Sequence, residues 1–275
     1  MKNIPVRRRA IAALGAALER VNGKGVFARK PEWYVRKIED NLVPGMPVDT
    51  IISQLGHGAG RELAEKIRAA YSSSALAVNA FGPWRSRPGE LILAGVRGFS
   101  QLNFEVRCPT GLKGTAPHLD VLADGAVVVG VESKCLEPLT THGAKFSSAY
   151  DSICDERAST KWFRLIKNLR SGRRSFQFLD ASQLVKHALG LQHKCPTSPA
   201  ILLYLFWEPS NASELEVFRQ HRAEVEELAE AVQGEHVQFA SQTYPDLWAS
   251  WEGVGKPPWL TAHVARLKRR YQVAI

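Results

Sequence analysis

The first third of the chain carries apolar residues at helical spacing. Within residues 1–22 an apolar side chain recurs every three or four positions, which predicts an amphipathic helix with one buried face: Ile11, Leu14, Leu18 and Val21. A second helix is expected within 31–42, and a Pro-Gly segment at 44–47 separates it from a longer helix at 48–71. The stretch 82–90 is rich in Pro, Gly and Arg and is expected to form a loop.

The centre of the chain changes to a pattern typical of strands. Residues 101–107 alternate between polar and apolar side chains. Residues 118–123 and 127–134 form two further strand-like segments, joined across Asp124 and Gly125, which together are a strong turn signal. Three consecutive strands are therefore predicted, with the last two forming a hairpin.

Helices and strands alternate in the remainder. A helix is expected near 158–170, and another from Asp180, where Gln183 three residues later completes a capping-box pattern, to residue 191. The continuous apolar run 200–207 is typical of a strand buried on both faces. The C-terminal part is expected to form a helix, a short strand and a basic helix, at 213–233, 236–241 and 260–271.

This order of elements predicts a fold of the α/β (α+β) class. Its centre is a mixed sheet of at least four strands, and the helices 54–71 and 180–191 flank it. The chain has 275 residues, of which 45% are hydrophobic and 23% are charged. A globular protein of this size buries enough apolar surface to fold without disulfides or structural metals.

Net charge and cysteine usage narrow the classes of function. A formal charge of +9 raises the chance of a polyanionic partner. The four cysteines contain no CxxC pair, which argues against a zinc ribbon or a disulfide framework and suits a reducing compartment. No apolar run approaches the roughly 18 residues that a membrane span needs. The basic, Ala-rich N-terminus faintly imitates a signal peptide, but Glu19 and Arg20 interrupt it, so we expect a cytoplasmic protein.

The residues with most chemical content end the strand 127–134. Side chains alternate between faces along a strand, so Glu132 and Lys134 project together while Ser133 points away. A charged pair at the end of an apolar strand costs free energy if it is buried without a purpose. The pair therefore indicates a site, with a surface strand carrying a salt bridge as the alternative.

Asp120 joins this pair only if it reaches the same face of the sheet. A two-residue turn would place Asp120 opposite Val129, on the wrong face. A three-residue connection, 124–126, places Asp120 opposite Gly130 and makes Glu132 its diagonal neighbour, with Cα atoms about 7–8 Å apart. We expect the three-residue connection.

Two carboxylates in this arrangement suit a hard divalent cation. Magnesium or manganese prefers oxygen ligands, retains several waters and binds substrate phosphates. Such an ion acidifies an attacking water, and a neighbouring lysine positions that water or stabilises developing negative charge.

The element order, with Asp120 on the second strand and Glu132-x-Lys134 on the third, resembles the PD-(D/E)XK nuclease superfamily. It is similar in particular to the restriction-endonuclease-like branch of bacterial proteins. The resemblance covers about residues 54–207, and it departs from the pattern in that two residues separate Pro117 from Asp120. It divides the chain into an N-terminal helical extension, a nuclease core and a C-terminal helix-strand-helix addition packed on that core, at 1–46, 47–210 and 211–275.

The resemblance implies a Mg²⁺-dependent (or Mn²⁺-dependent) nuclease that hydrolyses DNA phosphodiester bonds. Asp120 and Glu132 would be metal ligands, the Ser133 carbonyl a further ligand, and Lys134 the group that positions water. The superfamily often adds an acid from the first core helix and a polar residue from the helix after the ExK strand. These correspond here to Glu62 and Gln183.

Several of these residues have other interpretations. Glu65 and Glu105 compete with Glu62, which could also be an ordinary exposed charge, and Gln183 could serve only as a helix cap. His187 shares a helix face with Gln183, although a half-buried structural histidine is the commoner case. His118 is expected to serve packing, and Glu137 to be a charge in a loop.

A run of basic residues lies between the ExK strand and the next core helix. It contains six cations and no acid, which favours contact with the phosphate backbone of DNA over a merely solvated helix face: Lys161, Arg164, Lys167, Arg170, Arg173 and Arg174. The expected partner is DNA, with no membrane and with a homodimer as one arrangement. The alternatives to a nuclease are a non-catalytic DNA-binding module on a nuclease scaffold, and an unrelated structural or interaction protein.

Overall fold

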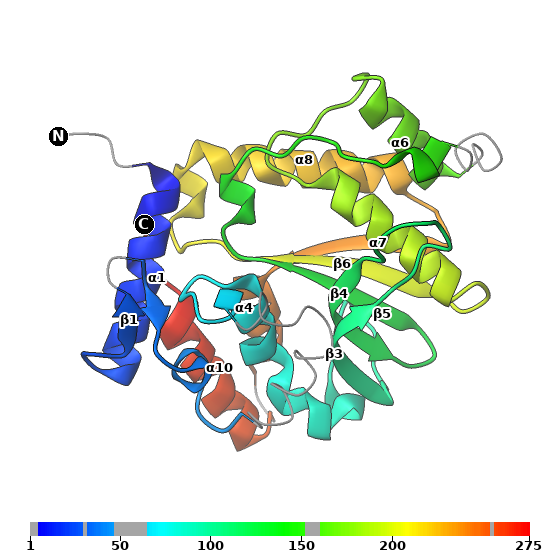
Figure 1. The fold of residues 1–275 in the computed structure, drawn as a ribbon. Helices are drawn as coiled ribbons and strands as arrows, with labels where there is room; N and C mark the ends of the chain where they lie inside the picture. Colours follow the sequence, from blue (N-terminus) through cyan, green and yellow to red (C-terminus); the bar gives the residue numbers. More distant parts are fainter. Residues whose placement is uncertain (1–4, 30–31, 47–64, 152–159, 254–255) are drawn as a thin grey trace.

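A five-stranded mixed sheet forms the centre of the structure, a computed structural model that describes residues 5–29, 32–46, 65–151, 160–253 and 256–275 (Figure 1). Its strands, in spatial and chain order, are β3 (Gln101–Arg107), β4 (His118–Asp124), β5 (Val128–Lys134), β6 (Ala200–Phe206) and β7 (Val237–Thr243). The first three pair antiparallel, whereas β5, β6 and β7 pair parallel. The predicted mixed sheet of at least four strands is confirmed.

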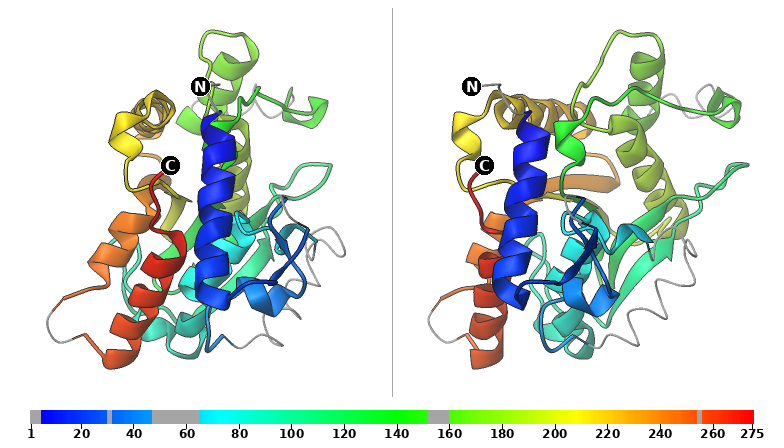
Figure 2. Two further views of the ribbon diagram at one scale, coloured as in Figure 1. Left: turned by 90° about the vertical axis from the view of Figure 1, so that its left-hand side faces the viewer. Right: turned by 60° about the vertical axis from the view of Figure 1, so that its left-hand side comes forward.

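Helices cover both faces of this sheet (Figures 1 and 2). One face is covered by α4 (Ser73–Phe81), α9 (Tyr244–Ser250) and α10 (Pro258–Tyr271), with α1 (Val6–Asn22) packed on α10. The other face is covered by α6 (Lys161–Arg170), α7 (Ala181–Lys194) and α8 (Glu216–Val232). Within the described ranges, no helix is both long enough and apolar enough to cross a lipid bilayer.

The apolar strand β6 separates the two hydrophobic layers, as its continuous apolar sequence predicts. Leu203 and Leu205 belong to the layer under α4 and α10, whereas Leu202 and Tyr204 belong to the layer under α7 and α8. A strand with helices on both faces must be apolar at every position, because neither face reaches water.

The segment expected to be a helix at 31–42 is not one. Tyr34–Val35 forms the short strand β2, which pairs with β1 (Phe27–Arg29), and a 3-10 turn follows at Ile38–Asn41. The backbone amide of Val35 donates to Arg68 across 2.9 Å. These long-range partners replace the hydrogen bonds that a helix would have formed within the segment.

The helix α4 packs against β5, and the sequence pattern did not indicate it. Every residue from Ala75 to Phe81 is buried, so the segment lacks the polar face that makes helical periodicity visible. Of the expected helix 48–71, the described part is helical only at 65–66 and turns by Ile67. Residues 47–64 lie outside the described ranges.

The N-terminal and C-terminal parts of the chain pack together with the central sheet. β7 lies in the stretch assigned to a C-terminal addition, yet it is the fifth strand of the sheet, so the expected boundary at residue 210 crosses that sheet. Arg270 of α10 is buried, and its guanidinium donates to three acceptors in the N-terminal part and the turn before α4: Leu14 O, Asn41 Oδ1 and Ala70 O.

Candidate active site

The register of the sheet aligns Asp120 with Glu132. Val121 pairs with Val131 at the last bonded position between β4 and β5, and continuing this register by one residue places Asp120 opposite Glu132. The connection has the expected three residues, but it spans 125–127 rather than 124–126, because Asp124 stays in β4, where its carbonyl accepts the Ser100 amide at 2.7 Å. The expected pairing of Asp120 with Gly130 is therefore wrong by two positions along β5. Because this shift is an even number of residues, the register still aligns Asp120 with the face of β5 that carries Glu132.

A third carboxylate continues this row on β3. The β3–β4 pairs on both sides of Glu105 share one register, which places Glu105 opposite Asp120. Glu105 has a φ of 50°, a left-handed conformation that is costly for a residue with a side chain and that persists mainly at functional sites. We therefore define the acidic row as Glu105, Asp120 and Glu132, on three neighbouring strands.

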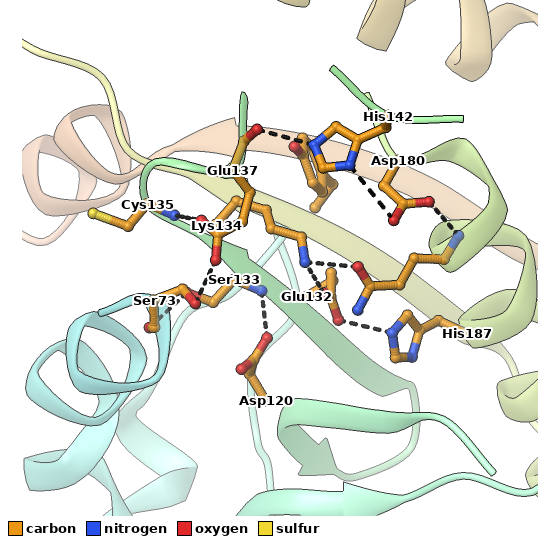
Figure 3. A network of polar contacts seen from close by, with 12 residues as sticks. Ser73, Asp120, Glu132, Ser133, Lys134, Cys135, Glu137, His142, Asp180 and His187 are labelled. Carbon is orange, nitrogen blue, oxygen red and sulfur yellow. Dashed lines mark hydrogen bonds and ion pairs between the residues drawn. The ribbon is translucent and has the colours of Figure 1, made fainter. Parts of the chain in front are cut away.

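The end of β5 faces α7 through a buried polar network (Figure 3). The Lys134 amine lies 2.6 Å from Glu132 Oε1 and donates to Gln183 Oε1 at 2.7 Å. His187 Nε2 lies 2.8 Å from Glu132 Oε2, and both side chains are almost fully buried. Because Gln183 and His187 are four residues apart on α7, they share the helix face turned to the sheet.

Gln183 has two separate roles in the structure. Its backbone amide donates to the carboxylate of the N-cap residue Asp180 at 2.9 Å, as the capping-box pattern predicts. Its side chain instead reaches Lys134. The cap and the site contact use different atoms, so one interpretation does not exclude the other.

Ser133 connects the site to the face of β5 opposite to Glu132 and Lys134. Its amide donates to Asp120 Oδ2 at 2.7 Å, while its hydroxyl lies 2.7 Å from the Tyr244 hydroxyl and donates to Ser73 O. The carbonyl of Lys134 bonds to β6 through Trp207 N. Because adjacent peptide groups alternate in direction along a strand, the Ser133 carbonyl faces the β4 side, where Asp120 lies.

Negative charge in the acidic row is only partly balanced. Burial, reinforced by Glu132 and Glu105, raises the pKa of Asp120 well above its ordinary value. Burial and Glu132 raise the pKa of Glu105 to about 7. Burial alone would also raise the pKa of Glu132, but Lys134 and His187 lower it to about 2. In the absence of a cation, Asp120 and Glu105 therefore favour their protonated forms, whereas Glu132 stays ionised.

The donors of the acidic row suit a divalent metal ion. Carboxylate oxygens and a strand carbonyl are the hard ligands that Mg²⁺ and Mn²⁺ prefer, and a cation beside Asp120 would offset the repulsion that raises its pKa. In the part of the chain that the structure describes, no three Asp, Glu, His or Cys side chains already converge as a cage, since Lys134 and His187 hold Glu132. The donor set fits the ion by its chemistry.

The acid expected from the first core helix is not on α4, which contains no Asp or Glu. Glu62 lies outside the described residues. Glu65 is exposed and pairs with Arg29 at 3.4 Å. Glu105, the other competitor, lies opposite Asp120 in the sheet, a position that is visible only when the register of β3 on β4 is known.

Glu137 is more than the loop charge that was expected. A 3-10 turn after β5 folds its carboxylate back, so that Oε1 accepts from Ser73 Oγ at 2.8 Å and Oε2 from the Cys135 amide at 2.7 Å. His118 is half-buried beside the site, and burial, Arg107 and His187 lower its pKa.

The basic run lies on the outer helix layer. α6 packs on α7 and α8 rather than on the acidic row (Figure 1). Lys161 donates to the Gln233 carbonyl, Arg170 pairs with Asp151, and Arg174 lies 3.0 Å from Glu227. The remaining cations of the run are exposed: Arg164, Lys167 and Arg173. Contact of this run with DNA stays a prediction.

The mixed sheet, its flanking helices and its acidic row define a restriction-endonuclease-like protein. Comparison with protein families agrees: residues 20–272 match the family described as Restriction Endonuclease associating with ARP, and the chain belongs to it. The match extends at both ends beyond residues 54–207, and it includes β7 and α10 but only the last residues of α1. No curated protein and no solved structure matches the chain.

Proposed function

We propose that the protein is a divalent-metal-dependent deoxyribonuclease that hydrolyses DNA phosphodiester bonds. The observation that carries the proposal is the acidic row across three neighbouring strands, with Lys134 two residues beyond Glu132 on the same strand. Membership of a restriction endonuclease family supports the same chemistry.

Asp120, Glu132 and the Ser133 carbonyl are the proposed metal ligands, with Glu105 as the additional acid. Mg²⁺ or Mn²⁺ bound there supplies an acidified water and offsets negative charge on the phosphate. The protein's own contribution is to hold the ligands on strand ends, where the backbone fixes their spacing.

Lys134 is the proposed electrostatic group of the site. Although burial opposes it, the carboxylates of Glu132, Glu137 and Asp120 raise the pKa of Lys134, so the amine is protonated at neutral pH. A protonated lysine cannot accept a proton from water. It therefore orients the attacking water or stabilises the phosphate oxygens, while Gln183 and Glu132 fix its position.

Supercoiled plasmid DNA tests this proposal. We expect nicking or linearisation with MgCl₂ or MnCl₂ and none with EDTA. DNA binding without cleavage under any of these metals would favour the non-catalytic DNA-binding module instead. A homodimer that cuts both strands, and action in the reducing cytoplasm, are further predictions of the proposal.

A further inference from the structure

A pocket of about 210 Å³ opens beside the end of β5, on the side away from α7. We call it the N-terminal pocket, because residues before α4 contribute most of its lining. Its chemically distinctive lining residues are Arg7, Tyr34, Lys66, Tyr71, Ser73 and Glu137.

The N-terminal pocket adjoins the candidate active site. Ser73 lies in its wall, and its carbonyl accepts from the Ser133 hydroxyl at 3.1 Å (Figure 3). Glu137, also in the wall, is close enough to Lys134 to raise the pKa of its amine. The pocket and the candidate active site therefore meet at the end of β5, where Ser133 and Glu137 connect them.

The lining combines cations with aromatic rings. Arg7 and Lys66 are exposed, and Arg7 is close enough to Tyr71 to lower the pKa of its hydroxyl against the raising effect of burial. The half-buried rings of Tyr34 and Tyr71 lie edge to face with centroids 6.3 Å apart. Cations that contact phosphates beside aromatic rings that contact bases are the combination that binds nucleic-acid strands.

The single acid in the wall does not oppose an anionic ligand strongly. Both carboxylate oxygens of Glu137 already accept hydrogen bonds, from Ser73 Oγ and from the Cys135 amide. Its charge is therefore turned toward the protein, whereas the Arg7 side chain is exposed.

Two other basic surfaces are weaker candidates for a strand adjoining the acidic row. Cations of the basic run, Lys161, Arg170 and Arg174 among them, already pair with acids or carbonyl groups, and α6 lies on the outer helix layer. The basic hollow between α1 and α10 is lined by Arg20 and Arg269, which stand in the last turns of their helices. There they offset the negative ends of the helix dipoles.

We propose that the N-terminal pocket binds the DNA nucleotide next to the phosphodiester that is cleaved. Arg7 and Lys66 hold its phosphate, and the rings of Tyr34 and Tyr71 contact its sugar and base. This inference rests on the proposed function, because it takes the acidic row as the place of cleavage.

The test measures DNA affinity in a Glu132→Ala background, so that binding is seen without cleavage. The variant Arg7→Ala/Lys66→Ala should weaken binding of a duplex of about 20 base pairs by roughly tenfold, and reduce the slope of log affinity against log salt by about 0.9, as the loss of one neutralised phosphate requires. The matched control is Lys24→Ala/Arg97→Ala, which removes the same charge from exposed sites. Lys24 follows the far end of α1, about 25 Å from Arg7, and Arg97 lies near the β4–β5 connection.

The outcomes separate this inference from the proposed function. Equal affinity in the pocket and control variants would overturn the pocket assignment, whether or not the wild type cleaves DNA. Loss of affinity only in the pocket variant supports it. If that loss occurs while the wild type cleaves no DNA with any metal, the pocket stands as a DNA site and the nuclease proposal fails.

Discussion

A lysine and a histidine share one buried carboxylate at the end of β5. Lys134 and His187 approach different oxygens of Glu132, at 2.6 and 2.8 Å. Together they keep this acid ionised against burial, whereas burial and the neighbouring carboxylates raise the pKa values of Asp120 and Glu105. The site is thus prepared for a cation on the side of Asp120 and Glu105.

The charge on Glu105 predicts a pH-dependent stability. Its pKa is about 7 in the folded protein, against an ordinary value of 4.5, so the folded state binds this proton more tightly than the unfolded chain. The free energy of unfolding should therefore decrease as pH rises from about 4.5 to 7. In EDTA, Glu105→Gln should flatten this decrease in thermal unfolding experiments, and Glu65→Gln should not. Equal pH profiles for wild type and Glu105→Gln would contradict the assignment.

The two roles of Gln183 can be separated by substitution at the start of α7. Gln183→Ala keeps the capped backbone amide, so we expect unchanged stability and a loss of cleavage rate of roughly tenfold, as Lys134 loses its fixed position. Asp180→Ala removes the cap and should cost about 1 kcal/mol of unfolding free energy. Thermal unfolding and plasmid cleavage measured on both variants check this. A Gln183→Ala variant that cleaves DNA normally would leave this residue as a cap residue only.

Among the secondary-structure elements, the strands were predicted best from the sequence. β3 lies where the alternation of polar and apolar residues predicted it, and β4 and β5 lie on either side of the predicted turn. α4 gave no such signal, since its apolar residues surround the whole helix. The helix expected at 31–42 does not form, because backbone groups of this segment hydrogen-bond to β1 and to Arg68 instead.

The candidate site, too, could be predicted only in part. Glu132 and Lys134 follow from local spacing on a strand, Gln183 follows from the resemblance to the nuclease superfamily, and their side chains meet as expected. The position of Asp120 depended on where the β4–β5 connection begins, which no local pattern decides. The position of Glu105 opposite Asp120 could not be predicted, because this alignment arises only after the strands have paired across the connection 108–117.

On the scale of the whole molecule, one buried arginine joins the two ends of the chain. The guanidinium of Arg270 satisfies three acceptors, and burial lowers its pKa. Arg270→Met should lower the free energy of unfolding by about 3 kcal/mol, because buried acceptors lose their donors. Arg269→Ala, at the exposed neighbouring position, should change the free energy of unfolding by less than about 0.5 kcal/mol. Urea denaturation measures both, and equal stability of the two variants would contradict a joining role.

The central claim is that the acidic row performs metal-dependent cleavage of DNA. Its most direct test is cleavage of supercoiled plasmid by wild type, Glu132→Ala and the matched acid variant Glu65→Ala, each at equal folded concentration in MgCl₂. We expect cleavage by wild type and Glu65→Ala, and its loss in Glu132→Ala by at least about a hundredfold, since a proposed metal ligand and the partner of Lys134 are removed together. Full activity of Glu132→Ala would contradict it.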